Sequence, residues 1–404
     1  MVNVAILGFG IVGSGVAEVL TAHENSIERK TGGLIRLKYI LDVREFSDSP
    51  FAGKFVKDFG VIENDPEVDI VVETIGGATV ALDFTRRALK AGKSVVTSNK
   101  ELVAAHGYEL TQLAKEKGVC YLFEASVGGG IPIIRPLSQC LAANEILEIY
   151  GILNGTTNYI LTRMIRAGLS FDAALKEAQD NGYAERDPSA DVEGRDACRK
   201  ICILAAIAFG RHIYPEQVPT KGITGITLAD VDYAESAGKN IKLLGRAIRG
   251  EDGRVCAFVA PHLVDRSNPL AGVEDVFNGI SVRGDAIGDV MFYGRGAGKL
   301  PTASAVVADV MDVARNMGHR KALSWEPGGD DTVCDESALA SLWYVRAGVP
   351  ADGLHTALPG CRLLERRESG GDESACLTGE ELPRAGLEEK LAGLEVRALF
   401  RVLD

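Results

Sequence analysis

The stretch VNVAILGFGIVG (residues 2–13) decides the fold of the front of the chain. Its first half is an apolar run typical of a buried strand, and the helical spacing of residues 14–30 predicts a helix after the glycines. At such a turn Gly8 permits the bend, Gly10 lets a pyrophosphate approach, and Gly13 lets helix and strand pack closely. A glycine-rich turn without a ligand is the alternative. We expect a dinucleotide, its phosphates facing the helix amides, to be bound by Gly8, Phe9, Gly10, Ile11, Val12 and Gly13.

The choice between NAD and NADP stays open in the sequence. The next predicted strand, LIRLKYILDV (34–43), contains Asp42 near its end, and Arg44 follows. An acid at this position binds the ribose 2′-hydroxyl of NAD, whereas an arginine accommodates the 2′-phosphate of NADP. Because both residues are present, either cofactor is compatible with the pattern.

Further strands and helices alternate along residues 68–134, which predicts a mostly parallel sheet. Ligands bind beyond the carboxyl ends of such strands. The strand predicted in VDIVVETIGG (68–77) ends in Thr74. SVVTSNKELV (94–103) contains the polar cluster from Thr97 to Asn99 and Lys100. A third strand, near 119–124, ends at Glu124. We expect Thr74, Asn99, Lys100 and Glu124 at this edge, although a lone lysine is normally a solvated surface charge.

The middle of the chain contains a charged segment, NGYAERDPSADVEGRDACRK (181–200), directly before an apolar run. The segment lacks the ligand spacing that a calcium loop requires. A solvated charged turn does not explain why acids and bases lie beside a core helix. A helix restarting near Asp191 places Asp196 and Lys200 on one face, where a partly buried pair could be tuned for proton transfer. Upstream, Asn154 and Thr156 begin a helix as plain caps or as substrate contacts.

The segment AQDNGYAERDPSADVEGRDACRK (178–200) resembles the signature of homoserine dehydrogenase. The resemblance extends over about residues 1–320 and is carried, in order, by GFGIVGSGV, TSNKELVA, EASVGGGIPII, NGTTNYIL and YGRGAGKLPTASAVVADV (293–310). It implies the reversible interconversion of L-homoserine and L-aspartate 4-semialdehyde with NADP or NAD, on the pathway to threonine, isoleucine and methionine.

The resemblance also implies residue roles. Lys200 is the expected proton donor or acceptor, and Lys100 is a second lysine at the reacting centre. Substrate binding is expected of Glu185, Asp196, Gly182, Asn154 and Thr156, with the two acids holding the amino group. Gly296 and Gly298 are expected to reach the cofactor, and a sodium-like cation is expected between Glu124 and the carbonyls of Val127, Gly129 and Ile131.

The expected fold class is α/β, with a Rossmann-type dinucleotide-binding domain at 1–135 completed by about 295–320. An α+β substrate and dimerisation domain is expected at 136–294, and a small α+β domain resembling a reduced ACT domain at 330–404. The last contains ESGGDESACLTGEELPRAG (368–386), which is typical of an exposed loop. No clear glycine-rich ligand turn of the ACT kind is present, so a feedback effector stays open.

Composition excludes several other functions. The net charge of −12 argues against a nucleic-acid surface, and no apolar run approaches the roughly 20 residues that span a bilayer. The opening residues lack a basic leader, and eight scattered cysteines indicate reduced thiols rather than disulfides or a zinc site, so a cytoplasmic protein is expected. The resemblance implies a homodimer. Two other functions are alternative hypotheses. One is an aspartate-semialdehyde dehydrogenase, which needs an acylating cysteine near a histidine. The other is a nucleotide sensor, which needs no Lys200.

Overall fold

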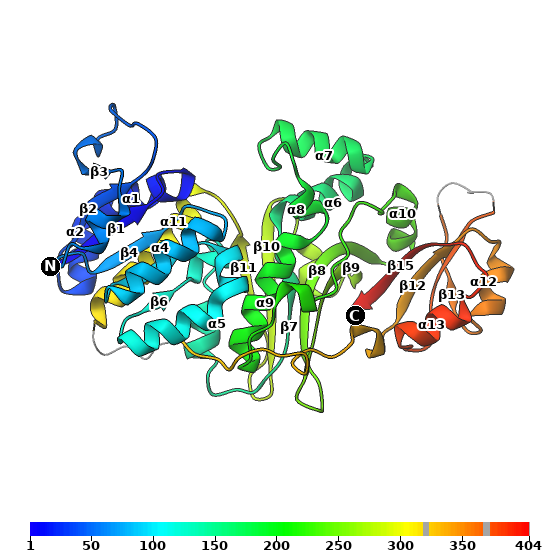
Figure 1. The fold of residues 1–404 in the computed structure, drawn as a ribbon. Coiled ribbons are helices and arrows are strands. Elements are labelled where there is room, and N and C mark those ends of the chain that lie inside the picture. Colours follow the sequence, from blue (N-terminus) through cyan, green and yellow to red (C-terminus); the bar gives the residue numbers. More distant parts are fainter. Residues whose placement is uncertain (318–322, 367–371, 404) are drawn as a thin grey trace. The chain divides into compact units, whose positions relative to one another are not determined.

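The chain forms two compact units in a computed structural model that describes residues 1–317, 323–366 and 372–403 (Figure 1). The first unit contains residues 1–145, 202–215 and 294–329, and the second contains residues 146–201, 216–293 and 330–404. The domain boundaries expected from the sequence stay a prediction, and their residues 318–320, 367–371 and 404 lie outside the described residues.

The first unit is built on a parallel six-stranded sheet. The strands lie in the order β3-β2-β1-β4-β5-β6, and every neighbouring pair is parallel. The order reverses between β1 and β4, which creates the crevice where dinucleotides bind in Rossmann-type folds. The predicted α/β class is therefore confirmed. The strands are β1 (Val2–Leu7), β2 (Ile35–Leu41), β3 (Phe55–Val56), β4 (Ile70–Glu73), β5 (Ser94–Thr97) and β6 (Tyr121–Leu122).

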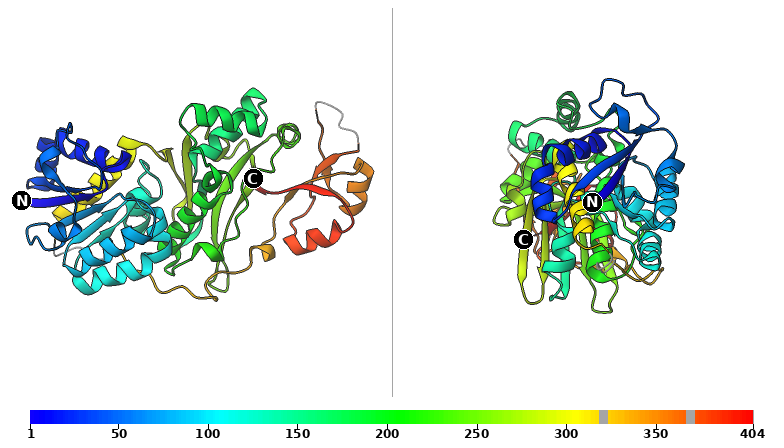
Figure 2. Two further views of the ribbon diagram at one scale, coloured as in Figure 1. Left: turned by 45° about the horizontal axis from the view of Figure 1, so that its top comes forward. Right: turned by 90° about the vertical axis from the view of Figure 1, so that its left-hand side faces the viewer.

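Helices cover both faces of this sheet (Figures 1 and 2). On one face lie α1 (Ile11–Ala22), α2 (Glu24–Thr31) and α11 (Lys299–Arg315), and on the other α4 (Thr79–Lys90) and α5 (Lys100–Lys117). The short α3 (Phe59–Glu63) precedes β4. The prediction of one helix over 14–30 is wrong, because the chain breaks at His23, which ends α1 and precedes α2.

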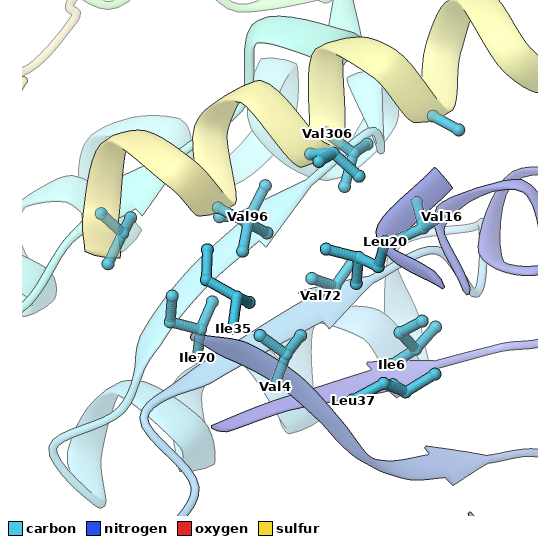
Figure 3. Packing of buried hydrophobic residues seen from close by; sticks show 14 of the residues in the cluster. Val4, Ile6, Val16, Leu20, Ile35, Leu37, Ile70, Val72, Val96 and Val306 are labelled. Atoms are coloured by element: carbon cyan, nitrogen blue, oxygen red, sulfur yellow. The ribbon is translucent and has the colours of Figure 1, made fainter. Parts of the chain in front are cut away.

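A late segment completes the core of the first unit. Val306 of α11 packs into the same apolar cluster as Val16 of α1 and Val72 and Val96 of the sheet (Figure 3). All four side chains are fully buried. Apolar burial of this kind stabilises a fold by about 25 cal/mol per Å². Because Val306 is buried in this cluster, residues 299–315 belong to the core of the first unit and not to the segment that precedes them.

The second unit contains a mixed nine-stranded sheet in the order β11-β10-β7-β8-β9-β15-β12-β14-β13. Its first five strands in chain order are β7 (Ile146–Ile152), β8 (Lys239–Arg249), β9 (Val255–Asp265), β10 (Phe277–Gly284) and β11 (Gly288–Arg295). Its helices are α6 (Gly155–Ala167), α7 (Phe171–Asp180), α8 (Ser189–Val192), α10 (Leu228–Ser236) and the first part of α9 (Arg195–Phe209), whose residues from 202 onward belong to the first unit. The helix expected to restart near Asp191 is interrupted, because Gly194 adopts φ +86° between α8 and α9.

The C-terminal segment contributes four strands to that same sheet. Its elements are β12 (Trp343–Ala347), α12 (Ala351–Ala357), β13 (Arg362–Leu363), β14 (Ser374–Leu377), α13 (Arg384–Lys390) and β15 (Val396–Leu403). β15 pairs in parallel with β9, so these strands continue the sheet. The expected exposed loop at 368–386 is wrong for β14, which is buried and paired with β12; residues 368–371 lie outside the described residues.

Two further expectations concern membranes and thiols. Within the described ranges, no helix combines the length and apolarity needed to cross a bilayer. The eight cysteines are free thiols, and six of them are buried, whereas Cys140 is exposed and Cys334 is half-buried.

Candidate active site

The glycine turn after β1 has the close contacts that require glycine. Gly8 adopts φ +90°, a backbone conformation that residues other than glycine rarely take. A Cβ atom on Gly13 would lie 1.9 Å from the carbonyl oxygen of Gly8, so α1 and the turn pack backbone against backbone. Nothing lies within 4 Å of a Cβ placed on Gly10, which leaves room at the turn. The three glycines therefore have the three properties expected of a dinucleotide turn.

At the start of α1, the described residues supply no side-chain cap for the backbone amides. Gly10 precedes the helix and supplies no side-chain cap, and the first turn contains no acidic residue. Ile11 is 73% exposed, whereas Val12 packs against the core of the unit. Free amides at a helix start bind anions, because the positive end of the helix dipole adds to the hydrogen bonds.

Asp42 is already bound by groups of its own unit. Its carboxylate accepts the backbone amide of Phe9 at 2.7 Å and the side chain of Arg44 at 2.9 and 3.0 Å. The hydrogen bond from Arg44 holds the pKa of the Asp42 carboxyl well below its ordinary value. The Asp42 side chain is 5% exposed and that of Arg44 58% exposed, so the cation is the residue that faces solvent.

A hydrogen-bonded network joins the carboxyl ends of β4 and β5. The Thr74 hydroxyl donates to the carbonyl of Gly8 at 2.9 Å and so ties β4 to the glycine turn. The Asn99 side chain caps α5 through Leu102 and donates to the carbonyl of Gly77 at 2.6 Å. Lys100 is the first residue of α5 and is half-buried. Thr74, Asn99 and Lys100 thus lie at the expected edge of the sheet.

Glu124 lies in a short 3-10 helix, Glu124–Ser126, rather than at the end of a strand as expected, because β6 stops at Leu122. One of its carboxylate oxygens accepts the amides of Ile133 and Ile134, and the other accepts the amide of Arg135 at 2.8 Å. Since a carboxylate oxygen accepts about two hydrogen bonds, the second oxygen keeps one position.

The carbonyl groups proposed for the cation belong to the following turn. In the described part of the chain, no hydrogen bond ends on the carbonyls of Val127, Gly129 or Ile131. Three carbonyl oxygens and one carboxylate position form a donor set that fits a hard monovalent cation.

The glycine-rich turn after Glu124 packs against the turn before α11. A Cβ on Gly129 would lie 2.3 Å from the carbonyl oxygen of Gly296, and the amide of Gly130 donates to the carbonyl of Arg295 at 3.1 Å. Gly298 adopts φ +124° immediately before α11. Gly296 and Gly298 are therefore part of the first unit, and only glycine permits the approach at Gly129.

Lys200 is the centre of a buried polar cluster in the second unit. Its ammonium donates to the Asp196 carboxylate and to the carbonyl of Leu153, both at 2.7 Å, and 8% of the side chain is exposed. The same Asp196 oxygen accepts the Asn154 amide at 2.8 Å, and that amide also donates to Asp191 at 2.7 Å. The structure thus brings together Asn154, Asp196 and Lys200, and their roles stay a prediction. Sequence reasoning missed Asp191 and the Leu153 carbonyl, of which only Asp191 belongs to the charged segment.

Other expected substrate residues are not part of this cluster. Thr156 donates through its hydroxyl to the carbonyl of Tyr183 at 2.7 Å and so fixes the loop after α7. Gly182, at φ +72°, and Glu185 lie exposed in that loop, where the carbonyl of Glu185 accepts the Gln179 side chain. The substrate role of Gly182 and Glu185 stays a prediction.

Two family models match the chain. The model described as homoserine dehydrogenase, NAD binding domain, matches residues 8–124, and the model described as homoserine dehydrogenase matches residues 132–311. The homoserine dehydrogenase of Bacillus subtilis is 42% identical over 320 residues, which cover 78% of this chain and 73% of that protein. The homoserine dehydrogenase of Synechocystis is 45% identical over 321 residues, covering 77% of this chain and 73% of that protein.

Solved structures are similar over most or all of the chain. A homoserine dehydrogenase from Thiobacillus denitrificans has a TM-score of 0.91 at 37% identity and covers 100% of this chain and 98% of its own. A hyperthermophilic archaeal homoserine dehydrogenase in complex with NADPH has a TM-score of 0.66 at 30% identity, with 77% of this chain and 97% of that chain covered.

Proposed function

The chain belongs to the homoserine dehydrogenase family, and from this premise we propose how its residues carry out the reaction. It is an oxidoreductase acting on a CH–OH group, and it interconverts L-homoserine and L-aspartate 4-semialdehyde with a nicotinamide cofactor. The observation that carries the assignment of roles is the buried ammonium of Lys200, held by Asp196 and a backbone carbonyl.

Lys200 is proposed to handle the proton of the reaction. The nicotinamide supplies or accepts the hydride, so the protein has to orient the substrate and move one proton. When the aldehyde is reduced, negative charge develops on its oxygen, and the Lys200 ammonium stabilises that charge and donates its proton to the oxygen. In the opposite direction, neutral Lys200 accepts the proton of the homoserine hydroxyl. Asp196 and the Leu153 carbonyl orient the Lys200 Nζ.

The remaining roles concern the charged ends of the substrate. Homoserine is a zwitterion, so its binding requires a carboxylate for the ammonium and cationic or amide donors for the carboxylate. We assign the ammonium to Glu185 and Asp196, and we keep Lys100 as a second lysine at the reacting centre. We assign the substrate side of the site to Gly182, Asn154 and Thr156. The hydrogen bond from Thr156 to Tyr183 supports this assignment, because it fixes the loop that carries Gly182 and Glu185.

NADP is the proposed preferred cofactor. The Asp42 carboxylate, which would bind a ribose 2′-hydroxyl, already accepts the Phe9 amide and two donors of Arg44. The exposed Arg44 guanidinium is left to meet a 2′-phosphate, which is the arrangement that favours NADP.

A sodium-like cation is proposed to bind Glu124 and the carbonyls of Val127, Gly129 and Ile131. The fit rests on the three carbonyls and on the remaining acceptor position of the Glu124 carboxylate. Such a cation would hold the glycine turn that contacts Gly296 and would take no part in the transfer of hydride or proton. Glu124→Gln should abolish any dependence of the unfolding temperature on sodium, with potassium and lithium chlorides as controls for ionic strength.

The reaction is tested by initial rates of homoserine oxidation with NAD⁺ and NADP⁺ in parallel. Turnover is expected with NADP⁺ and more weakly with NAD⁺, and a purified protein that turns over neither contradicts the proposal. A homodimer in the cytoplasm completes the proposal. The mass of the protein by light scattering tests the dimer, and cell fractionation tests its location.

A further inference from the structure

Glu73, the last residue of β4, is a fully buried carboxylate with no role in the reaction described so far. One of its oxygens accepts the hydroxyl of Thr97 at 2.6 Å, and the other accepts the backbone amide of Ile75 at 2.7 Å. A buried ionisable side chain without a structural ion pair is uncommon in proteins and is often found at functional sites.

The groups that donate to Glu73 are neutral. They are the Thr97 hydroxyl and the Ile75 amide, and the neutral amide of Gly76 and side chain of Asn99 also act to lower the pKa of Glu73. Burial raises the pKa of Glu73, and these donors act against the rise. Neutral donors stabilise a carboxylate but do not cancel its charge, so an ionised Glu73 exerts an electrostatic field on its surroundings, weakly screened in a buried site.

The position of Glu73 places this field under one half of the cofactor. In a sheet of this order the pyrophosphate lies at the start of α1, and the residues after β2 bind the adenosine ribose. Since Asp42 and Arg44 follow β2, the nicotinamide half extends to the other side of the turn, over the carboxyl ends of β4 and β5. Glu73 ends β4 and directly precedes Thr74. Its donor Thr97 ends β5 and lies two residues before Asn99.

We propose that Glu73 acts electrostatically on the nicotinamide and favours binding of the oxidised cofactor over the reduced one. The oxidised ring carries a positive charge, whereas the reduced ring is neutral, so a buried negative charge discriminates between them. The inference rests on the proposed binding of the cofactor at this sheet edge. In this proposal Glu73 acts only through its negative charge. It transfers no proton and does not contact the substrate.

The test measures the dissociation constants of NADP⁺ and NADPH for the same protein. The wild-type protein should bind NADP⁺ at least as tightly as NADPH. Glu73→Gln, which keeps the size of the side chain, should weaken NADP⁺ binding by at least about fivefold and change NADPH binding less than about twofold. Equal changes for both forms would overturn the proposal, because a damaged binding site affects both alike.

Two comparisons separate charge from structure. Thr97→Val removes a donor of the same network but leaves the carboxylate, so it should shift the ratio of the two dissociation constants less than Glu73→Gln does. A shift of their ratio as large as that of Glu73→Gln would count against the charge. If Glu73→Gln does not fold, the wild-type ratio decides, and NADPH bound more tightly than NADP⁺ contradicts the field of Glu73. A wild-type protein that binds neither form contradicts the proposed function itself.

Discussion

The ammonium of Lys200 and the carboxylate of Asp196 lie 2.7 Å apart, one helical turn from each other on α9, with 8% and 4% of their side chains exposed. A buried ion pair contributes little net stability, because desolvation of the two charges offsets their attraction. The same burial makes the pair suitable for proton transfer, since the position of the Lys200 Nζ is set by Asp196 and Leu153.

Replacement of Lys200 by methionine should lower kcat by about 10²–10⁴-fold, which is the usual contribution of a general acid or base. The dissociation constant of the cofactor should change less than about threefold, because Lys200 is not part of the glycine turn. Steady-state rates and fluorescence titration with NADPH measure the two effects.

Lys242 supplies the matched control. It is also buried in the second unit, where it donates to the Asn158 side chain and the Val273 carbonyl, and burial lowers its pKa to about 8. Lys242→Met should lower the unfolding temperature but leave kcat within about threefold. If both variants lose activity equally, or if Lys200→Met keeps it, the assigned role of Lys200 is wrong.

Arg44→Ala should raise KM for NADP⁺ at least tenfold and leave KM for NAD⁺ within about threefold, because a charge-assisted contact with a phosphate contributes about 1.5–3 kcal/mol. Arg36, an exposed arginine of β2, is the control for loss of one positive charge. A similar loss with both cofactors would show that Arg44 supports the glycine turn through Asp42 instead of reading the 2′-phosphate.

Arg346 should be important for the stability of the second unit. Its guanidinium donates to Asp230 at 2.7 and 3.1 Å and to Glu373 at 2.8 Å, and Asp230 is fully buried. Arg346→Met removes the cation that pairs with the buried Asp230, whereas Glu373 keeps Arg397, so it should lower the free energy of unfolding by about 3–5 kcal/mol. Asp230→Asn combined with Arg346→Met should cost less than the sum of the single changes. Urea denaturation measures both, and a cost of Arg346→Met below about 1 kcal/mol contradicts the prediction.

His262 should contribute to a loss of stability in acid. Its ring is fully buried in β9, and burial lowers its pKa to about 3. The ordinary value near 6.5 applies to the unfolded chain. Between these values the unfolded state binds the additional proton, so stability falls as the pH drops from 6.5 towards 3, by at most about 1.4 kcal/mol per pH unit.

The measurement compares His262→Gln with the wild-type protein at pH 7, 6 and 5. The variant should lose less unfolding free energy than the wild type over this range. His355→Gln removes an exposed histidine and should keep the wild-type slope. An unchanged slope in His262→Gln would mean that other groups cause the acid instability.

Local patterns in the sequence were sufficient for several features of the fold and the site. The apolar run before Gly8 and the helical spacing after Gly13 predicted the strand, the turn and the helix, because these depend on neighbours in the chain. The separation of four residues between Asp196 and Lys200 likewise predicted a shared helical face.

The resemblance to a family extended these patterns to residue roles. Spacing alone could not select Glu185 from the other acids of the charged segment, and the structure leaves it exposed in a loop. Its assignment therefore rests on the family and stays a prediction.

The sequence by itself determined the dinucleotide turn, the alternation of strands and helices, and the pairing of Asp196 with Lys200, since each is encoded within one or two turns of chain. Only the tertiary structure decided that Phe9 binds Asp42, that Leu153 and Asn154 complete the Lys200 cluster, and that β15 pairs with β9. These contacts join residues that are 33 or more positions apart. Which distant groups meet is set by the packing of whole elements, and no local periodicity records it.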